Sequence, residues 1–295
     1  MNAGNFAERL RSREQLIGYW VVLDAPVATE RIARIGYDYM ALDGQHGLLG
    51  YQGLLTNLMA IDAGASLRTP GGAGTGTVGL VRVEANNPTP IGRALDAGAA
   101  GVIVPLVDTA ADAARAVAAA RYPSARAASG AGAPAAANAG SAGASAGGVL
   151  RAPGGGVRSY GPMRSGLRIG PVPAEADAAT VVLAMIETPQ GLANVAEICA
   201  TPGLDGIYVG PSDLCLAVGG RYPGDPDVAE EFDAALELIA KTARAAGVAA
   251  GIHTPDGETA QRRLAAGYTY ATVASDLTHL EAIATTHLNN ARSSS

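Results

Sequence analysis

Residues 78–120 read VGLVRVEANNPTPIGRALDAGAAGVIVPLVDTAADAARAVAAA, and this stretch decides the fold class. It predicts a strand over 78–83, a helix near 89–97, a second strand over 101–106 and a second helix near 109–120. Both strands are nearly continuous apolar runs. That pattern is typical of a parallel sheet covered by helices on its faces.

The same strand-helix unit repeats before and after this stretch. Further strands are predicted over 17–23, 38–43, 180–187, 205–210, 247–252 and 268–274, and helices near 27–35, 51–63, 189–199, 228–246, 256–265 and 276–291. Eight units without a strand-only region favour a single α/β domain over 1–295, a closed (β/α)₈ TIM barrel. An open Rossmann-like sheet is the alternative, but no G-x-G-x-x-G motif follows an early strand.

Two low-complexity segments interrupt the repeat, at about 66–77 and 124–155. Both are rich in Ala, Gly, Ser and Pro and contain few large apolar side chains. Ordering such a segment costs backbone entropy and buries little surface in return. We therefore expect two flexible insertions, and we expect residues 124–155 to be disordered.

Composition excludes several classes of function. The chain has 295 residues, 48% of them hydrophobic, with 21 basic and 27 acidic side chains and a net charge of −6. It lacks the basic field that nucleic-acid binding needs. Two cysteines are too few for a disulfide framework or a zinc cluster, and neither a secretory signal nor a strongly apolar run of membrane-spanning length is found. We expect a cytoplasmic protein without a nucleic-acid or membrane partner.

Polar side chains follow several of the predicted strands, where a barrel places its catalytic groups. Glu187 and Asp213 follow neighbouring strands, so their carboxylates are predicted to face one cavity. Two carboxylates form a hard-oxygen set suited to Mg²⁺, Mn²⁺ or Co²⁺. Helix capping is the alternative for either residue alone.

Other strand-end residues carry a positive charge, an imidazole or an aromatic ring. Arg82 is predicted to stabilise negative charge on a substrate, or else to form a structural ion pair. His46, which follows Asp43 and Gln45, is a candidate proton acceptor, and His253 is a secondary site candidate. Trp20 is predicted either to line the substrate site or to pack in the core.

Several motifs resemble the HpcH/HpaI aldolase family of metal-dependent pyruvate aldolases. They are LDGQHGLLGYQ (42–52), LVRVEANNPTPIGRALDAGAAGVIVPLVDT (80–109), AARYP (119–123), VRSYGPMR (157–164), LAMIETPQGLANVAEI (183–198), LDGIYVGPSDLCLAVG (204–219) and AAGIHTPDG (249–257). They cover nearly the whole chain apart from the insertions and the tails. The resemblance implies a (β/α)₈ barrel assembled as a homo-oligomer, a hexamer or a trimer-based assembly, in which neighbours exchange the last helix.

The resemblance also implies roles for individual residues. It implies that Glu187 and Asp213 bind the divalent ion, that His46 accepts the proton and that Asp96 raises the basicity of that histidine. Arg82 matches the arginine that stabilises the transition state. The backbone of Ser212 is expected to bind the substrate carboxylate. Met185 stands where some members have a substrate-binding glutamine, and Gln45 replaces a glutamate, so a different branch is indicated.

The implied activity is reversible aldol cleavage of a 4-hydroxy-2-oxo acid to pyruvate and an aldehyde through a metal-stabilised enolate. The expected partners are therefore a small 2-oxo acid and an aldehyde. One alternative is related enolate chemistry with another electrophile in a siderophore or secondary-metabolite pathway. A second alternative is a non-catalytic barrel that serves as a binding protein.

Overall fold

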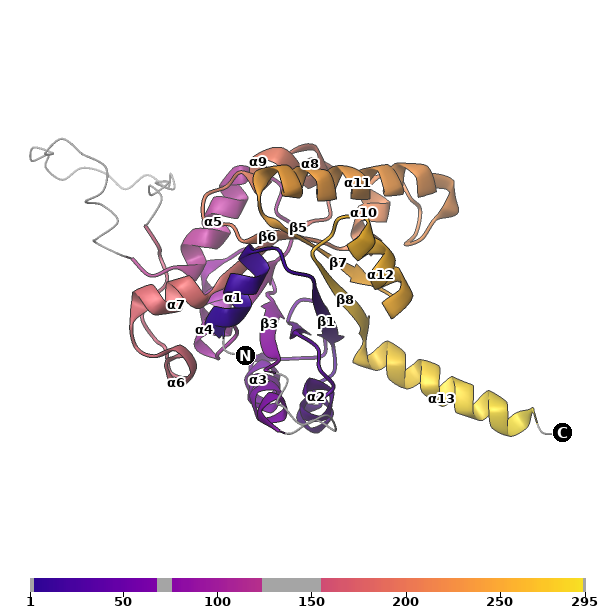
Figure 1. Cartoon of the computed structure of the whole chain (residues 1–295), viewed down its shortest axis with the longest axis horizontal. Coiled ribbons are helices and arrows are strands. Elements are labelled where there is room, and N and C mark those ends of the chain that lie inside the picture. The colour runs from indigo at the N-terminus through magenta and orange to yellow at the C-terminus, as the bar shows by residue number, and fades with distance from the viewer. Residues whose placement is uncertain (1–2, 68–75, 124–154, 294–295) are drawn as a thin grey trace, which may run out of the picture.

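The computed structural model describes residues 3–67, 76–123 and 155–293. Eight parallel strands close into one barrel in chain order, which confirms the predicted TIM barrel (Figure 1). They are β1 (Leu16–Val21), β2 (Tyr39–Asp43), β3 (Val78–Arg82), β4 (Gly101–Val104), β5 (Val181–Ile186), β6 (Gly206–Val209), β7 (Ala249–Thr254) and β8 (Tyr270–Ser275). β8 pairs with β1 and closes the barrel.

Helices connect the strands on the outside of the barrel. Those that the sequence pattern predicts are α2 (Pro26–Ala33), α3 (Tyr51–Ser66), α4 (Pro88–Asp96), α5 (Ala110–Ala120), α11 (Ala229–Ala246), α12 (Gly257–Ala265) and α13 (Asp276–Arg292). The predicted helix over 189–199 is instead two short helices, α8 (Pro189–Ala193) and α9 (Val195–Cys199). The side chain of Asn194, the residue between them, donates to the Asp108 carbonyl at 2.8 Å. This contact with the β4 side of the barrel fixes the break.

The structure also contains helices that the pattern did not predict. They are α1 (Ala3–Arg11), α6 (Ser165–Ile169), α7 (Pro173–Ala179), α10 (Pro211–Ala217) and the 3₁₀ turn Pro226–Val228. α1 packs against one end of the barrel: Phe6 is fully buried and its ring centroid lies 5.8 Å from that of Tyr39. Most of the two predicted insertions, residues 68–75 and 124–154, lies outside the described residues. At the edge of the second, Pro123 and Gly155 form an antiparallel bridge.

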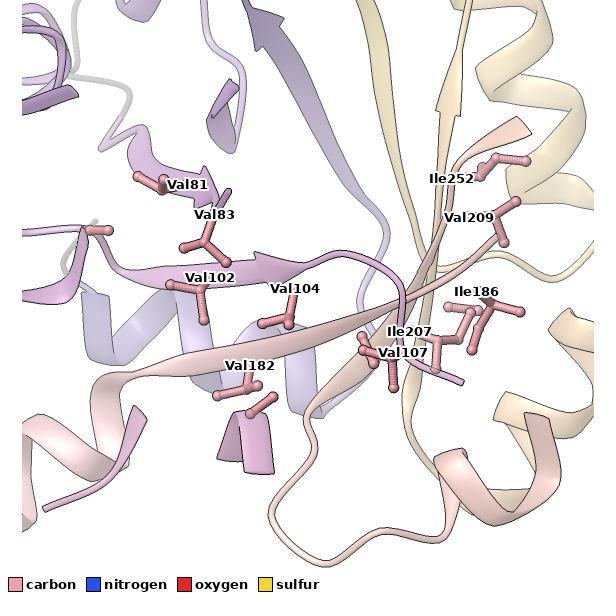
Figure 2. Close-up of a cluster of buried hydrophobic side chains, with 14 of the residues drawn as sticks. Val81, Val83, Val102, Val104, Val107, Val182, Ile186, Ile207, Val209 and Ile252 are labelled. Atoms are coloured by element: carbon pink, nitrogen blue, oxygen red, sulfur yellow. The ribbon is translucent and has the colours of Figure 1, made fainter. Parts of the chain in front are cut away.

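Alternate residues of each strand belong to two separate apolar clusters. On β5, Val182, Ala184 and Ile186 pack outside the barrel, against the helices, whereas Val181, Leu183 and Met185 belong to the cluster inside it. Figure 2 shows part of the outer cluster, in which valine and isoleucine side chains from β3, β4, β5, β6 and β7 lie together. Because both faces are buried, the strands appear in the sequence as unbroken apolar runs.

Tyrosines fill the centre of the barrel, and glycines make room for them. A Cβ on Gly251 would lie 2.0 Å from the ring of Tyr270, so only glycine fits at this position of β7. The Tyr208 hydroxyl donates to Thr272 Oγ1 at 2.9 Å, and Tyr39 shares a 2.7 Å hydrogen bond with the same oxygen. Hydrogen-bonded side chains therefore close the barrel beneath the carboxyl ends of the strands.

α13 leaves the barrel after its first turn and extends away from it (Figure 1). Its start is held by the Asp276 carboxylate, which accepts the backbone N–H groups of Val22 and Leu23 at 2.9 and 3.1 Å. Every residue of α13 from Leu277 onward is exposed. Among the described helices, none has the length and apolar character that crossing a membrane requires.

Candidate active site

Arg82 and Asp43 form a buried ion pair at the carboxyl ends of β3 and β2. Arg82 Nε donates to Asp43 Oδ1 at 2.9 Å and Nη2 donates to Oδ2 at 2.6 Å, so the contact is bidentate. Residues 43 and 82 are register partners on the adjacent strands, which explains why the two side chains meet. The alternative role predicted for Arg82, a structural ion pair, is thus present, and it fixes the guanidinium at the barrel mouth.

Asp43 remains ionised although it is buried. Burial raises the pKa of its carboxyl group, but the hydrogen bonds and charge of Arg82 outweigh this effect, and the net pKa lies below its ordinary value. The backbone N–H groups of His46 and Gln45 also donate to Asp43 Oδ1, at 3.0 and 3.1 Å. Asp43 therefore holds both the arginine and the turn that carries His46.

Trp20 lies beside this pair and is 6% exposed. Its indole N–H donates to Asp43 Oδ2 at 3.3 Å, and the Arg82 guanidinium carbon lies 5.0 Å from the centre of the indole ring. The ring stacks on Tyr208 at a centroid distance of 5.9 Å. Trp20 thus packs as a wall of the barrel mouth, next to the charged groups, while its role in binding substrate stays a prediction.

Glu187 follows β5 and is 5% exposed. Its position continues the inward series Val181, Leu183 and Met185, so the carboxylate faces the barrel interior. Oε1 accepts the backbone N–H of Leu106 at 2.8 Å. Burial raises the pKa of Glu187, the Leu106 hydrogen bond opposes that rise, and the nearby charge of Asp213 adds to it.

Glu187 and Asp213 border one small space beside Gly210. A Cβ on Gly210 would lie 3.0 Å from Glu187 Oε2 and 3.6 Å from Asp213 Oδ2. It would also lie 3.1 Å from the terminal methyl of Met185, which is buried. Glycine thus keeps the space between the two carboxylates open. The carboxylates of Glu187 and Asp213 therefore border the same space, as predicted, and Met185 forms an apolar wall of that space.

The donor set fits a hard divalent cation that retains several positions for water or substrate. Both side chains offer carboxylate oxygens, the ligands that Mg²⁺ and Mn²⁺ prefer. Within the described residues there is no group of three or more His, Cys, Asp or Glu side chains arranged to hold a metal. Among the described residues of this chain, the site therefore offers the carboxylates of Glu187 and Asp213 as ligands, and water and substrate oxygens would complete the coordination.

His46 and Ser212 lie in the loops and turns after β2 and β6. His46 is exposed, and Ser212 is exposed in the first turn of α10, next to Asp213. Both lie on the side of the barrel where the strands end, as the sequence analysis predicts. Their roles in proton transfer and in carboxylate binding stay predictions.

Asp96 lies at the other end of the barrel from the residues described above. It is the last residue of α4, and its carboxylate accepts Arg158 Nη2 at 2.6 Å. Helices of a (β/α)₈ barrel run back toward the amino ends of the strands, so Asp96 and His46 lie at opposite ends. One chain by itself therefore does not bring Asp96 to His46, and the effect of Asp96 on the basicity of that histidine stays a prediction.

The backbone of Leu106 also belongs to the site, although the sequence pattern did not predict this. Leu106 has a φ of 53°, in the left-handed region that non-glycine residues rarely adopt, and the residue is 58% exposed. This conformation directs its N–H to Glu187. Only the uncommon backbone conformation marks this residue, because its side chain carries no chemistry.

Comparisons with known proteins identify the family of the chain. The family model for HpcH/HpaI aldolase/citrate lyase matches residues 16–282. A hydroxypyruvate/pyruvate aldolase of Rhizorhabdus wittichii is 34% identical over 274 residues, which cover 92% of each chain. A 5-keto-4-deoxy-D-glucarate aldolase of Salmonella paratyphi C is 32% identical over 92% of this chain and 90% of its own.

Solved structures share the fold over the whole length. The crystal structure of a HpcH/HpaI aldolase/citrate lyase family protein from Burkholderia cenocepacia superposes with a TM-score of 0.73 and 30% identity. The match covers 98% of this chain and 99% of that protein. The matched regions include the strands that carry the site.

Proposed function

The chain belongs to the HpcH/HpaI aldolase/citrate lyase family, and on this premise we propose that it is a divalent-metal-dependent pyruvate aldolase of class II. The proposed reaction is the reversible aldol cleavage of a 4-hydroxy-2-oxo acid to a 2-oxo acid, pyruvate or hydroxypyruvate, and an aldehyde. The names of the relatives support an aldolase-type carbon–carbon lyase. The residues of the site support the more specific proposal, a divalent-metal-dependent pyruvate aldolase.

The observation that carries the proposal is the pair of carboxylates beside Gly210. Glu187 and Asp213 would hold the ion, Mg²⁺, Mn²⁺ or Co²⁺, with oxygen ligands only. A bound divalent ion supplies positive charge that polarises the carbonyl of a 2-oxo acid and makes the neighbouring C–H group more acidic. Lys241, the only lysine of the chain, is exposed on α11 outside the barrel, so no lysine is placed to form a Schiff base at the carboxyl ends of the strands.

Other residues of the site are proposed to transfer the proton, to stabilise negative charge and to bind the substrate. His46 accepts a proton from the carbon next to the carbonyl or, in the cleavage direction, the proton of the 4-hydroxyl group. Arg82, held by Asp43, places a fixed positive charge near the oxygen on which negative charge develops. The backbone of Ser212 binds the substrate carboxylate, and Met185 and Trp20 line the pocket.

Two other functions are compatible with the same barrel. An enzyme that uses the same enolate with another electrophile, in a siderophore or secondary-metabolite pathway, would retain every residue named above. A binding protein without catalytic activity has no need of a buried arginine beside two carboxylates. The side-chain set therefore favours an enzyme.

Exchange of the pyruvate methyl protons in deuterated water tests the proposal without knowledge of the aldehyde. We expect exchange by the wild-type protein with Mg²⁺, Mn²⁺ or Co²⁺, and its loss after EDTA. Glu187→Gln and Asp213→Asn should each lower the exchange rate by about 100-fold or more, because each weakens binding of the divalent ion whose positive charge would stabilise the anion. NMR of the methyl signal measures the rate.

Glu197→Gln is the matched control, because Glu197 is exposed on α9 and is not one of the residues assigned to the site. Its exchange rate should equal that of the wild type. Exchange that survives EDTA would refute metal dependence. Exchange without any aldol addition, in a screen of aldehydes with pyruvate, would instead favour the alternative electrophile. No exchange with any divalent ion would favour the binding protein.

A further inference from the structure

His253 lies at the barrel mouth, and the proposed mechanism gives it no role. It is on β7, next to the strand that leads to Asp213, and its position continues the inward series of Ala249 and Gly251. Its ring meets the Trp20 ring edge-on, at a centroid distance of 5.4 Å and an angle of 72°. His253 and Trp20 together form the wall of the barrel mouth beside Arg82.

The two nitrogens of His253 differ in their surroundings. Within the described part of the chain, Nδ1 is buried and has no hydrogen-bond partner. Nε2 has no protein partner in the described residues either, but it is not among the fully buried atoms without a partner, so solvent or a substrate can reach it. A buried N–H without an acceptor costs more than a buried lone pair, so the proton of a neutral ring belongs on Nε2.

The neighbouring charges keep the ring neutral. Burial and the positive charge of Arg82 lower the pKa of His253 to about 4, and the charge of Asp43 opposes this only in part. A ring that is neutral near pH 7 is a poor general acid, and its Nε2–H is a hydrogen-bond donor without a net charge. A neutral donor beside an aromatic face suits a hydroxylated carbon, whose C–H groups contact the ring while its oxygen accepts the hydrogen bond.

We propose that His253 is a specificity-determining residue whose Nε2–H binds a hydroxyl group of the substrate. The proposal rests on the function proposed above, because it places the 2-oxo acid between the carboxylate pair and the wall formed by His253 and Trp20. Two substrate parts could supply the hydroxyl group: the carbon next to the carbonyl, as in hydroxypyruvate, or the aldehyde, as in glycolaldehyde. The shared chemistry is a neutral hydroxyl on a short carbon chain.

Three substitutions at His253 separate hydrogen bonding from packing. His253→Leu removes the donor and keeps much of the volume. His253→Gln carries an amide nitrogen near the place of Nε2, whereas the shorter His253→Asn carries it near the place of Nδ1. We expect His253→Gln to retain the preference for hydroxylated substrates, and we expect His253→Leu and His253→Asn to lose it.

The experiment has two arms, each with a hydroxylated and a plain substrate. The first compares kcat/KM for α-proton exchange of hydroxypyruvate and of pyruvate. The second compares glycolaldehyde and acetaldehyde as acceptors for pyruvate. In one arm, His253→Leu should reduce the ratio of kcat/KM for the hydroxylated substrate to kcat/KM for the plain substrate by about 10- to 100-fold. This is the effect of leaving one polar group unpaired. The arm that changes identifies which part of the substrate bears the hydroxyl.

Equal losses for hydroxylated and plain substrates in both arms would overturn the proposal, because a residue that only supports the fold affects them alike. An unchanged ratio in both arms would overturn it as well. If His253→Leu does not fold, the same ratios of kcat/KM for His253→Gln and His253→Asn test the proposal. Equal ratios for these two variants would contradict a hydrogen-bond donor at Nε2.

A binding measurement on the wild-type protein keeps this proposal separate from the proposed function. The chain has four histidines, so the imidazole ¹⁵N signals are few, and the signal absent from His253→Gln identifies His253. Hydroxypyruvate or glycolaldehyde should shift its Nε2 signal more than pyruvate or acetaldehyde does. A shift without proton exchange would support His253 and refute the aldolase, whereas exchange without a selective shift or a changed ratio would refute only the role of His253.

Discussion

At the scale of single residues, the contact between Arg82 and Asp43 matters most. Both side chains are nearly buried, with side-chain exposures of 10% and 3%. A buried ion pair adds little net stability, but the loss of one partner leaves a buried charge without compensation. The pair therefore positions the arginine at the barrel mouth, and each partner depends on the other.

Asp43→Asn should reduce the free energy of unfolding by about 3–5 kcal/mol, because Arg82 then stays buried without a counter-charge. Urea unfolding followed by circular dichroism measures the change. The control is Asp233→Asn, which breaks the exposed pair with Arg263 and should cost less than about 1 kcal/mol. Equal losses in the two variants would show that the Arg82 pair is not buried in solution.

The same pair predicts a pH dependence of stability. The pKa of Asp43 is lowered in the folded protein, so its ionised form stabilises the fold at pH values above its ordinary pKa. This contribution disappears as the pH falls below about 4 and through the folded pKa. The stability difference between wild type and Asp43→Asn should therefore be largest near pH 7 and shrink in acid. A difference that grows in acid would contradict the assignment.

At the scale of elements, the alternation along each strand places the site. Asp43, Arg82, Glu187 and His253 occupy positions that continue the inward-facing series of their strands. The loops then refine this placement: the left-handed Leu106 after β4 supplies an N–H group to Glu187 after β5. Strands supply the side chains and adjacent loops fix their orientation.

Close packing around β7 predicts that Gly251→Ala is strongly destabilising. The added methyl group would lie 2.0 Å from the Tyr270 ring, and making room for it should cost about 1–3 kcal/mol or more. Gly257→Ala, in α12, is the control because nothing lies within 4 Å of the added methyl. Its melting temperature should match or slightly exceed that of the wild type. A wild-type melting temperature for Gly251→Ala would contradict the tyrosine-filled centre.

At the scale of the whole molecule, most of α13 is exposed in the described structure, although His279 near its start contacts Tyr19 of β1. Leu277, Leu280, Ile283 and Leu288 are 45–55% exposed along one broad face of a helix that extends from the barrel. An isolated helix of this length is marginally stable in water, and an exposed apolar face favours association. We propose that α13 packs against a second copy of the chain in a homo-oligomer.

Leu280→Glu combined with Ile283→Glu should reduce the molar mass measured by light scattering after size exclusion, because charge would replace the apolar contact. Asn289→Glu, an exposed position elsewhere around the same helix, adds charge as a control and should leave the mass unchanged. A wild-type protein with the mass of one chain would refute the assembly. An oligomer unaffected by the double substitution would place its interface elsewhere.

The sequence by itself determined the barrel and most candidate residues. Continuous apolar strands separated by helices allow few arrangements, and the carboxyl ends of parallel strands meet at one end of a closed barrel. The positions of Arg82, Glu187 and Asp213 follow from this rule. The predicted helix over 189–199 failed because Asn194 bonds across to the Asp108 carbonyl, a contact that the local pattern does not contain.

Only the tertiary structure decided which groups touch. The register between β2 and β3 joins Asp43 to Arg82, and the return of α4 to the far end of the barrel separates Asp96 from His46. The contact of His253 with Trp20 and the burial of its Nδ1 are likewise visible only in the folded barrel. Periodicity sets the direction of a side chain within its own element, whereas its partners come from segments far away in the chain that meet only when the barrel closes.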